Sequence, residues 1–96
     1  MLPVVEVIAT RTRVLIGDTV NLTCNVTTGD PSYANYTWTF MSARLQEVTN
    51  VLMLTINNAS NFGNYICEAT NVAGSGSGTI SIEQGGIIML TNVNVI

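Results

Sequence analysis

Residues 61–71, NFGNYICEATN, place a tyrosine two residues before a cysteine and two residues after a glycine. Polar and apolar residues alternate along this stretch, so Tyr65, Cys67 and Ala69 lie on one face of a predicted strand. Gly63 can form a tight turn at the start of the strand. The Tyr65 hydroxyl can then hydrogen-bond to the backbone of the preceding corner. The stretch therefore predicts a strand that enters a core directly after a corner held by its own tyrosine.

The same period of two recurs along the chain, whereas no window carries the apolar stripe of an amphipathic helix. Short turn-rich segments separate the alternating runs, a pattern typical of a β-sandwich or barrel. The clearest predicted strands lie within residues 3–17, 19–26, 35–40, 50–56, 65–71 and 79–83. Residues 74–78, GSGSG, are expected to form a flexible hairpin, because they precede no helix and lack the spacing of a phosphate-binding loop. We predict an all-β domain of about seven strands.

The two cysteines of the chain, Cys24 and Cys67, lie on different predicted strands among inward-facing apolar residues. Trp38 lies between them on a third strand. Inward-facing cysteines on two packed sheets can bridge the roughly 10 Å between the sheets. The alternative is two separate buried thiols in a different kind of β domain.

Taken in order, these features resemble the immunoglobulin superfamily, and most closely its I-set/C2-type domains, over residues 4–83. The matching residues are Leu22-Thr23-Cys24, Trp38, Leu54-Thr55-Ile56, the stretch 61–71 and Gly74. The resemblance implies an immunoglobulin-like, two-sheet Greek-key sandwich with a Cys24–Cys67 disulfide. It also implies a core signature formed by Trp38, Leu54, Gly63 and Tyr65. Only residues 41–49 separate two predicted strands, so we expect a short crossing strand after Phe40 and little or no D strand.

One residue departs from the family pattern. The family usually has an aspartate where this chain has Asn61, and that aspartate often pairs with a basic residue on the strand before the Leu54 strand. Because an asparagine carries no charge, we expect Asn61 to form no such ion pair and Arg44 to be left free.

The composition excludes several classes of partner. The chain has 96 residues, of which 9% are charged, against roughly 25% in an average soluble protein. Its basic residues are Arg11, Arg13 and Arg44, and a net charge of −3 gives no footprint for nucleic acid. No apolar run is long enough to insert into a membrane. The polar surface is rich in Asn, Thr and Ser, and such neutral surfaces tend to associate unless glycans or a partner cover them.

The chain is expected to be a single domain taken from a longer protein. Its first residues lack the basic and apolar regions of a signal peptide. We place an immunoglobulin-like domain at residues 1–84. Residues 85–96 are then a C-terminal extension, a linker or the start of a following domain.

Four N-x-S/T sequons occur, where chance alone would give roughly two. Their asparagines are Asn21, Asn25, Asn35 and Asn58. Asn21, Asn25 and Asn35 alternate with inward-facing residues, and Asn58 lies in a turn-rich corner, so all four are predicted to be accessible to N-glycosylation. Glycans on Asn21 and Asn25 would cover the sheet that holds Cys24. The other sheet would stay open, and it is our candidate for a partner face, through the outward residues Thr37, Thr39, Ile66, Glu68 and Thr70.

The chain offers no basis for catalysis. It has no histidine, which excludes Ser-His-Asp and Cys-His nucleophiles and removes the commonest zinc ligand. The carboxylates are spread over different elements, so no close acid–base pair is expected. We predict no catalytic residue, no metal and no cofactor.

We therefore expect extracellular protein–protein recognition by a module of a larger cell-surface adhesion or receptor protein, binding a like or an unlike partner. One alternative is a structural module of an intracellular filament protein, which would keep its thiols reduced and carry many Lys and Glu. A second alternative is a ligand-binding ectodomain piece of an enzyme-linked receptor.

Overall fold

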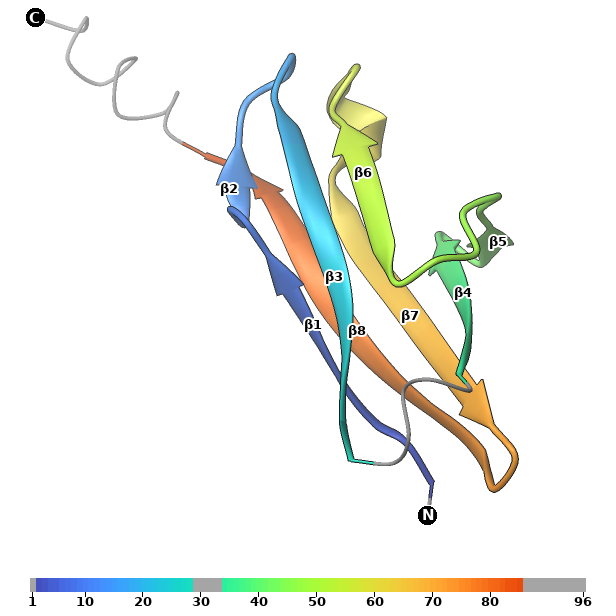
Figure 1. The fold of residues 1–96 in the computed structure, drawn as a ribbon. Coiled ribbons are helices and arrows are strands. Elements are labelled where there is room, and N and C mark those ends of the chain that lie inside the picture. Colours follow the sequence, from blue (N-terminus) through green and yellow to red (C-terminus); the bar gives the residue numbers. More distant parts are fainter. Residues whose placement is uncertain (1, 29–33, 86–96) are drawn as a thin grey trace, which may run out of the picture.

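The computed structural model describes residues 2–28 and 34–85, which form two packed β-sheets (Figure 1). One sheet has three strands in the order β1-β3-β6, and the other has five in the order β2-β8-β7-β4-β5. The strands are β1 Val4–Ala9, β2 Arg13–Val14, β3 Thr19–Thr28, β4 Asn35–Phe40, β5 Ala43–Arg44, β6 Val51–Thr55, β7 Gly63–Asn71 and β8 Gly74–Gln84. The predicted all-β sandwich is confirmed. The described residues hold eight strands because two very short ones, β2 and β5, extend the larger sheet.

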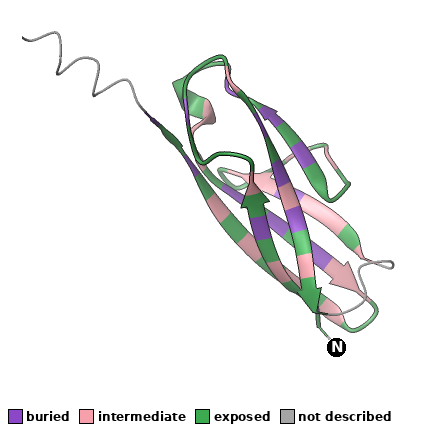
Figure 2. Cartoon of the chain, turned by 60° about the vertical axis from the view of Figure 1, so that its left-hand side comes forward, coloured by how far each residue is buried: buried purple, intermediate pink, exposed green. Residues whose placement is uncertain are grey.

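The predicted alternation places the core between the two sheets. Buried and exposed residues alternate along the strands, as Figure 2 shows. The buried apolar side chains come from both sheets and include Leu22, Trp38, Leu54, Tyr65 and Ile82. Fully burying a side chain of this size contributes roughly 1.5–3 kcal/mol.

A disulfide joins Cys24 of β3 to Cys67 of β7 across this core, with a Cα–Cα distance of 6.1 Å. The predicted bridge is therefore confirmed. Trp38 lies directly opposite Cys67 on the neighbouring strand β4 and is fully buried. Its indole Nε1–H donates to the Thr49 carbonyl at 2.8 Å, which satisfies the one polar group of the ring. The same contact anchors the loop after β5 to the core.

The corner before β7 has the tyrosine contact expected from the sequence. The Tyr65 hydroxyl donates to the Asn61 carbonyl at 2.6 Å. Gly63 has φ of +145°, and a Cβ there would lie 3.0 Å from the Phe40 ring. The conformation therefore favours glycine, and a Cβ at this position would also press on the Phe40 ring. Phe40 in turn stacks on Tyr65 with ring centroids 4.2 Å apart.

The same corner contains a short 3-10 helix, η2 Ala59–Asn61, which the sequence pattern does not predict. The Asn61 carboxamide oxygen accepts hydrogen bonds from the backbone N–H groups of Asn57 at 2.8 Å and Asn58 at 3.1 Å. Asn61 thus holds the corner through backbone contacts instead of an ion pair. Within residues 2–28 and 34–85, the ion pairs are Arg11–Asp18 and Arg13–Glu83, and neither involves Arg44.

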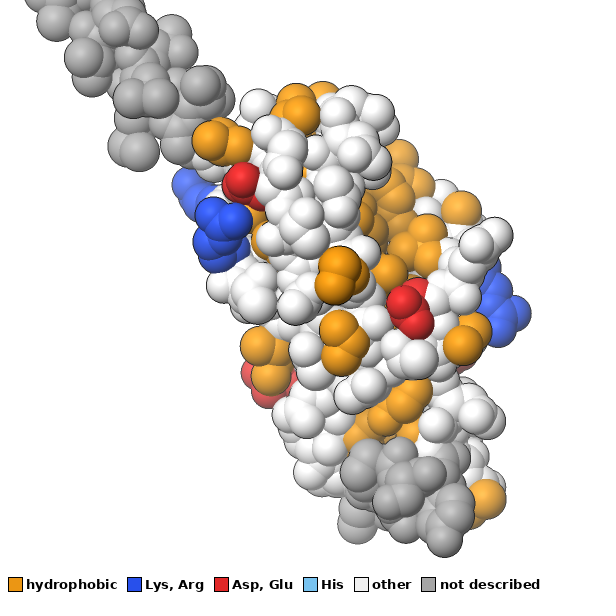
Figure 3. Space-filling model, turned by 45° about the horizontal axis from the view of Figure 1, so that its top comes forward, with side chains coloured by type: hydrophobic (Ala, Val, Ile, Leu, Met, Phe, Trp, Pro, Cys, Tyr) orange, Lys and Arg blue, Asp and Glu red, His pale blue; other side chains and the backbone are white. Residues whose placement is uncertain are grey.

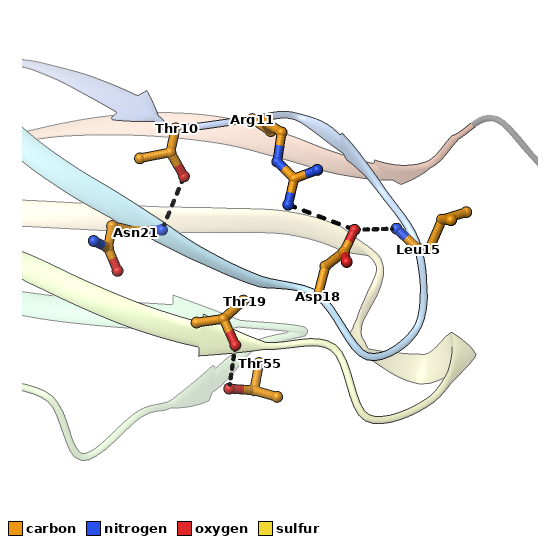
Figure 4. A network of polar contacts seen from close by, with 7 residues as sticks. All are labelled: Thr10, Arg11, Leu15, Asp18, Thr19, Asn21 and Thr55. Carbon is orange, nitrogen blue, oxygen red and sulfur yellow. Dashed lines mark hydrogen bonds and ion pairs between the residues drawn. The ribbon is translucent and has the colours of Figure 1, made fainter.

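The N-terminal segment changes sheets between β1 and β2. β1 pairs antiparallel with β3, whereas β2 pairs parallel with β8. The turn after β2 has Gly17 at φ of +102°. The Asp18 carboxylate accepts a hydrogen bond from the Leu15 N–H at 2.9 Å, and it forms an ion pair with the Arg11 guanidinium at 3.6 Å (Figure 4). The first residues therefore close the edges of both sheets.

The short strand expected after Phe40 is β5, but it does not cross to the other sheet. Met41 and Ser42 have φ of 53° and 64°, values that suit a tight two-residue hairpin turn. This turn directs β5 back along β4, so the expectation of a crossing strand is wrong. Residues 45–50 form no strand, in agreement with the predicted lack of a D strand.

The glycine-rich segment is also different from the expectation. The turn is confined to Val72 and Ala73, and residues 74–78 belong to β8 and pair with β7 along its length. Gly76 and Gly78 lie against β1, where a Cβ would come within 1.9 Å of the Pro3 carbonyl oxygen and 2.8 Å of the Val5 carbonyl oxygen. These glycines therefore let two backbones approach closely, and they do not form a flexible hairpin.

The predicted extension at residues 85–96 lies outside the described residues, apart from Gly85. The Gly85 N–H donates to the Val14 carbonyl at 3.0 Å and so continues the pairing of β8 with β2.

Candidate functional site

The structure gathers the five predicted partner-face residues on the outward face of the five-stranded sheet. Thr37 lies opposite Glu68, and Thr39 lies opposite Ile66, in the pairing of β4 with β7. Thr70 lies opposite Asn35 at the end of the same pairing. We call this surface the outer face. Directly opposite side chains in an antiparallel pair have Cβ atoms about 4.5–5.5 Å apart, so the five residues form one contiguous surface.

Strand β8 adds three residues to the outer face that sequence reasoning missed. Ser75, Ser77 and Thr79 lie opposite Thr70, Glu68 and Ile66 respectively. The Thr70 and Ser75 hydroxyls are 2.7 Å apart and form a hydrogen bond. The alternation of glycine and serine in residues 74–78 carried this signal, because glycines facing the core put the serines on the outside.

Strand β5 adds a charge at the other side of the outer face. Arg44 lies opposite Thr39, in the row that continues to Ile66. Its guanidinium adds a positive charge to a surface whose predicted residues already include the Glu68 carboxylate. Ile66, 37% exposed, is the large apolar side chain between them.

The core behind this face holds it in place. Ile66 and Glu68 flank Cys67, which is fixed by the disulfide. Burial raises the pKa of the Tyr65 hydroxyl above its ordinary value, which keeps the hydroxyl protonated as the donor to Asn61. Because the strands that carry the outer face are cross-linked, its backbone loses little conformational entropy when a partner binds.

The loop beneath Trp38 contains the other shifted group. The Thr49 hydroxyl donates to the Glu47 carboxylate at 2.8 Å, and the Thr49 N–H donates to it at 3.3 Å. These hydrogen bonds lower the pKa of Glu47. They stabilise the loop whose Thr49 carbonyl accepts the indole N–H of Trp38, which is a structural role.

The described part of the chain contains no group of three or more side chains able to hold a metal ion. No helix in that part is long and apolar enough to cross a membrane.

The four sequon asparagines are all exposed. Asn21 and Asn25 lie on the outward face of the three-stranded sheet, and Asn35 lies at the end of the outer face beside Thr70. Asn58 is the N-cap of η2, where its carboxamide oxygen accepts the Ser60 N–H at 2.9 Å. Glycosylation of these residues stays a prediction.

The family model described as "Immunoglobulin domain" matches residues 3–71, which include both cysteines, Trp38 and the tyrosine corner. The chain belongs to this family. The predicted resemblance is therefore confirmed, and no curated protein matches the chain significantly by sequence.

Solved structures with the same fold come from several sources. The full ectodomain of mouse nectin-like molecule 4 matches with 29% identity and a TM-score of 0.71, over 85% of this chain and 30% of that one. Murine CEACAM1b matches with 25% identity and a TM-score of 0.69, over 85% and 44% of the two chains. The three N-terminal domains of the outer capsid protein Hoc of bacteriophage RB49 match with 22% identity and a TM-score of 0.73, over 85% and 28%, and at that identity they show the fold alone. The chain thus spans less than half the length of each, and its relatives include domains of cell-adhesion and recognition proteins.

Proposed function

We propose that this domain is a non-catalytic, extracellular protein-recognition module of a larger cell-surface protein, and that the outer face binds its partner. The observation that carries the proposal is the composition of the outer face. Ile66 is an exposed apolar side chain among neutral hydroxyls, with Glu68 next to it on the outward face of β7 and Arg44 beyond Thr39 in the same cross-strand row. An apolar centre with a polar rim is the usual anatomy of a protein–protein contact.

The disulfide supports the compartment that we propose. Persistent disulfides form in oxidising compartments and are rare in the cytosol. The Cys24–Cys67 bridge therefore supports an extracellular location over the intracellular filament alternative. The scarcity of charge supports the same choice.

Binding would proceed by surface complementarity. Removing Ile66 from water makes the binding free energy more favourable without fixing the orientation of the partner. The charges of Glu68 and Arg44 set that orientation. The hydroxyls of Thr37, Thr39 and Ser77 can each donate or accept, so they fit a polar protein rim without demanding a charge.

The test uses the domain displayed as a tetramer and screened against ectodomains of its source organism, including a second copy of itself. Ile66→Arg is expected to reduce binding to the captured ectodomain at least tenfold, because it places an unpaired charge at the centre of the contact. The matched control is Met53→Arg, which puts the same charge on the opposite sheet and should leave binding unchanged. Equal binding by the Ile66→Arg variant and the parent would refute the outer face as the site.

A further inference from the structure

The outward face of the three-stranded sheet carries three exposed apolar side chains near Asn21. Ile8 and Val51 lie on either side of Thr23 in one cross-strand row, and Met53 lies opposite Asn21 in the next row. Their exposed fractions are 47% for Ile8, 38% for Val51 and 68% for Met53. We call these three residues the apolar patch. Figure 3, which views the molecule from this side with its top turned forward, shows separate hydrophobic side chains on an otherwise polar surface.

Asn21 stands at the edge of the apolar patch with its carboxamide exposed. Its backbone N–H donates to the Thr10 hydroxyl at 3.2 Å, and Figure 4 shows the side-chain amide directed away from that contact. Met53 is its direct cross-strand neighbour, whereas Val51 and Ile8 are diagonal neighbours, about 7–8 Å away in an antiparallel sheet. A group attached to the Asn21 amide therefore begins within reach of all three apolar side chains.

The other strand sequons have a polar residue directly opposite them. Asn25 lies opposite Glu6 and Asn35 lies opposite Thr70, both polar neighbours. Asn58 already uses its carboxamide oxygen to cap η2. Ile8 is a diagonal neighbour of Asn25 as well, but of the three strand sequons only Asn21 has an apolar side chain, that of Met53, directly opposite it.

From this juxtaposition we propose that Asn21 carries an N-linked glycan whose first sugar packs on the apolar patch. The inference rests on the proposed function in one respect: the chain must pass through a secretory compartment to receive the glycan. The Asn21 amide nitrogen would bond to the anomeric carbon of an N-acetylglucosamine that heads a lipid-linked oligosaccharide. The bond from that carbon to the pyrophosphate oxygen breaks, the lipid pyrophosphate leaves, and the amide nitrogen loses one proton.

A pyranose ring offers a face of C–H groups, and covering apolar side chains with that face removes both surfaces from water. The oligosaccharide that follows the first sugar would then keep proteins away from the three-stranded sheet. This arrangement explains why an exposed methionine is tolerated on that sheet, and it leaves the outer face as the accessible surface.

Site mapping is the first experiment. The 96-residue chain is secreted from cells that add N-glycans, released from its glycans by peptide N-glycosidase in heavy-oxygen water, and mapped by mass spectrometry. Asn21 is expected to be occupied. A secreted chain with Asn21 unmodified would overturn the proposal, and it would leave the binding result with Ile66→Arg unaffected.

Packing on the patch is tested by stability. The glycan is trimmed to one N-acetylglucosamine, and the Tm of the parent is compared with that of Asn21→Gln. We expect the single sugar to raise the Tm by about 4 °C, a shift that a modest stabilisation gives in a domain of this size. In a Met53→Thr background, this difference should fall to less than half, because the largest apolar surface under the sugar is gone.

The matched control is Asn25→Gln, whose effect on the Tm should not depend on Met53, because Asn25 lies four residues along β3 from Asn21, the residue that faces Met53. A sugar effect at Asn21 that is equal in the parent and the Met53→Thr background would refute the packing. So would an Asn21→Gln chain that stays monomeric and equally stable, whereas dimerisation of that chain through Met53 would assign the patch to a second copy.

Discussion

Gly76 provides the most direct test of how the two sheets are closed at their edge. A Cβ added there would lie 1.9 Å from the Pro3 carbonyl oxygen, and a real Cβ needs at least 3.0 Å. β8 cannot move aside, because it is paired with β7 from Gly74 to Ile82. The Gly76→Ala change should therefore push the start of β1 away from the sandwich.

Two opposing effects decide whether Gly76→Ala stabilises or destabilises the fold. Gly to Ala inside a strand usually stabilises by roughly 0.5–1 kcal/mol, because alanine loses less backbone freedom on folding. Overpacking a tight contact costs about 1–3 kcal/mol. We expect a net loss of about 1.5 kcal/mol in the free energy of unfolding, and a fall in Tm of roughly 5–10 °C.

Urea unfolding measures the effect through Trp38, the one tryptophan of the chain, which is fully buried. With an m-value of about 1–3 kcal/mol/M, the midpoint should fall by roughly 1 M. Ser77→Ala, on the same strand but outward, is the control and should stay within about 0.5 kcal/mol of the parent.

A truncation separates the clash from other causes. A chain that starts at Val4 lacks the Pro3 carbonyl, so Gly76→Ala should cost almost nothing in that background. The reasoning would be refuted if Gly76→Ala were as stable as Ser77→Ala in the full chain. It would be equally refuted if the loss were the same with and without Pro3.

Three further changes test the core and its corner. Replacing both Cys24 and Cys67 by alanine should cost about 4 kcal/mol on the chain-entropy model for a 43-residue loop, measured by urea unfolding against the oxidised parent. Asn61→Ala should lower the free energy of unfolding by roughly 1–3 kcal/mol in the same assay, because it removes the acceptor of two backbone N–H groups of the corner. Asn61→Asp keeps an acceptor oxygen and should lower it less. Since burial raises the pKa of Tyr65 above its unfolded value of about 10, its neutral form stabilises the fold fully below pH 10, and this contribution is lost as the pH rises through the folded-state value. Stability measured from pH 8 to 11.5 should therefore fall at the alkaline end, and a Tyr65→Phe chain should show a weaker fall; an unchanged slope in that variant would contradict this assignment.

Much of the fold could be predicted because its signals are local. The alternation of residues fixes which side of each strand is buried, and two inward cysteines with a tryptophan between them define the sandwich. Gly63 and Tyr65 could be placed for the same reason, since the turn and the hydroxyl contact lie within four residues of each other. The five partner-face residues follow from this alternation once the sheet is known.

The features that could not be predicted depend on long-range pairing. The direction of β5 is set by two residues with positive φ, Met41 and Ser42, neither of which is a usual choice for that conformation. Arg44 joins the outer face only because β5 turns back along β4. The apolar patch likewise requires the register of three strands, which the chain order alone does not specify.

The glycine-serine alternation in β8 connects the local sequence pattern with the long-range packing of the strands. Glycines in a short run usually indicate flexibility, and the same residues can equally well belong to a strand whose inner face meets another backbone. Here the inner face needs glycine because the carbonyls of Pro3 and Val5 approach it, and the period of two then fixes serine on the outside at positions 75 and 77. Close packing of β1 on one side of β8 and a row of hydroxyls on the other are therefore consequences of one sequence pattern. A change at an inward glycine should consequently disturb the edge of the sandwich, while a change at an outward serine should alter recognition without altering stability.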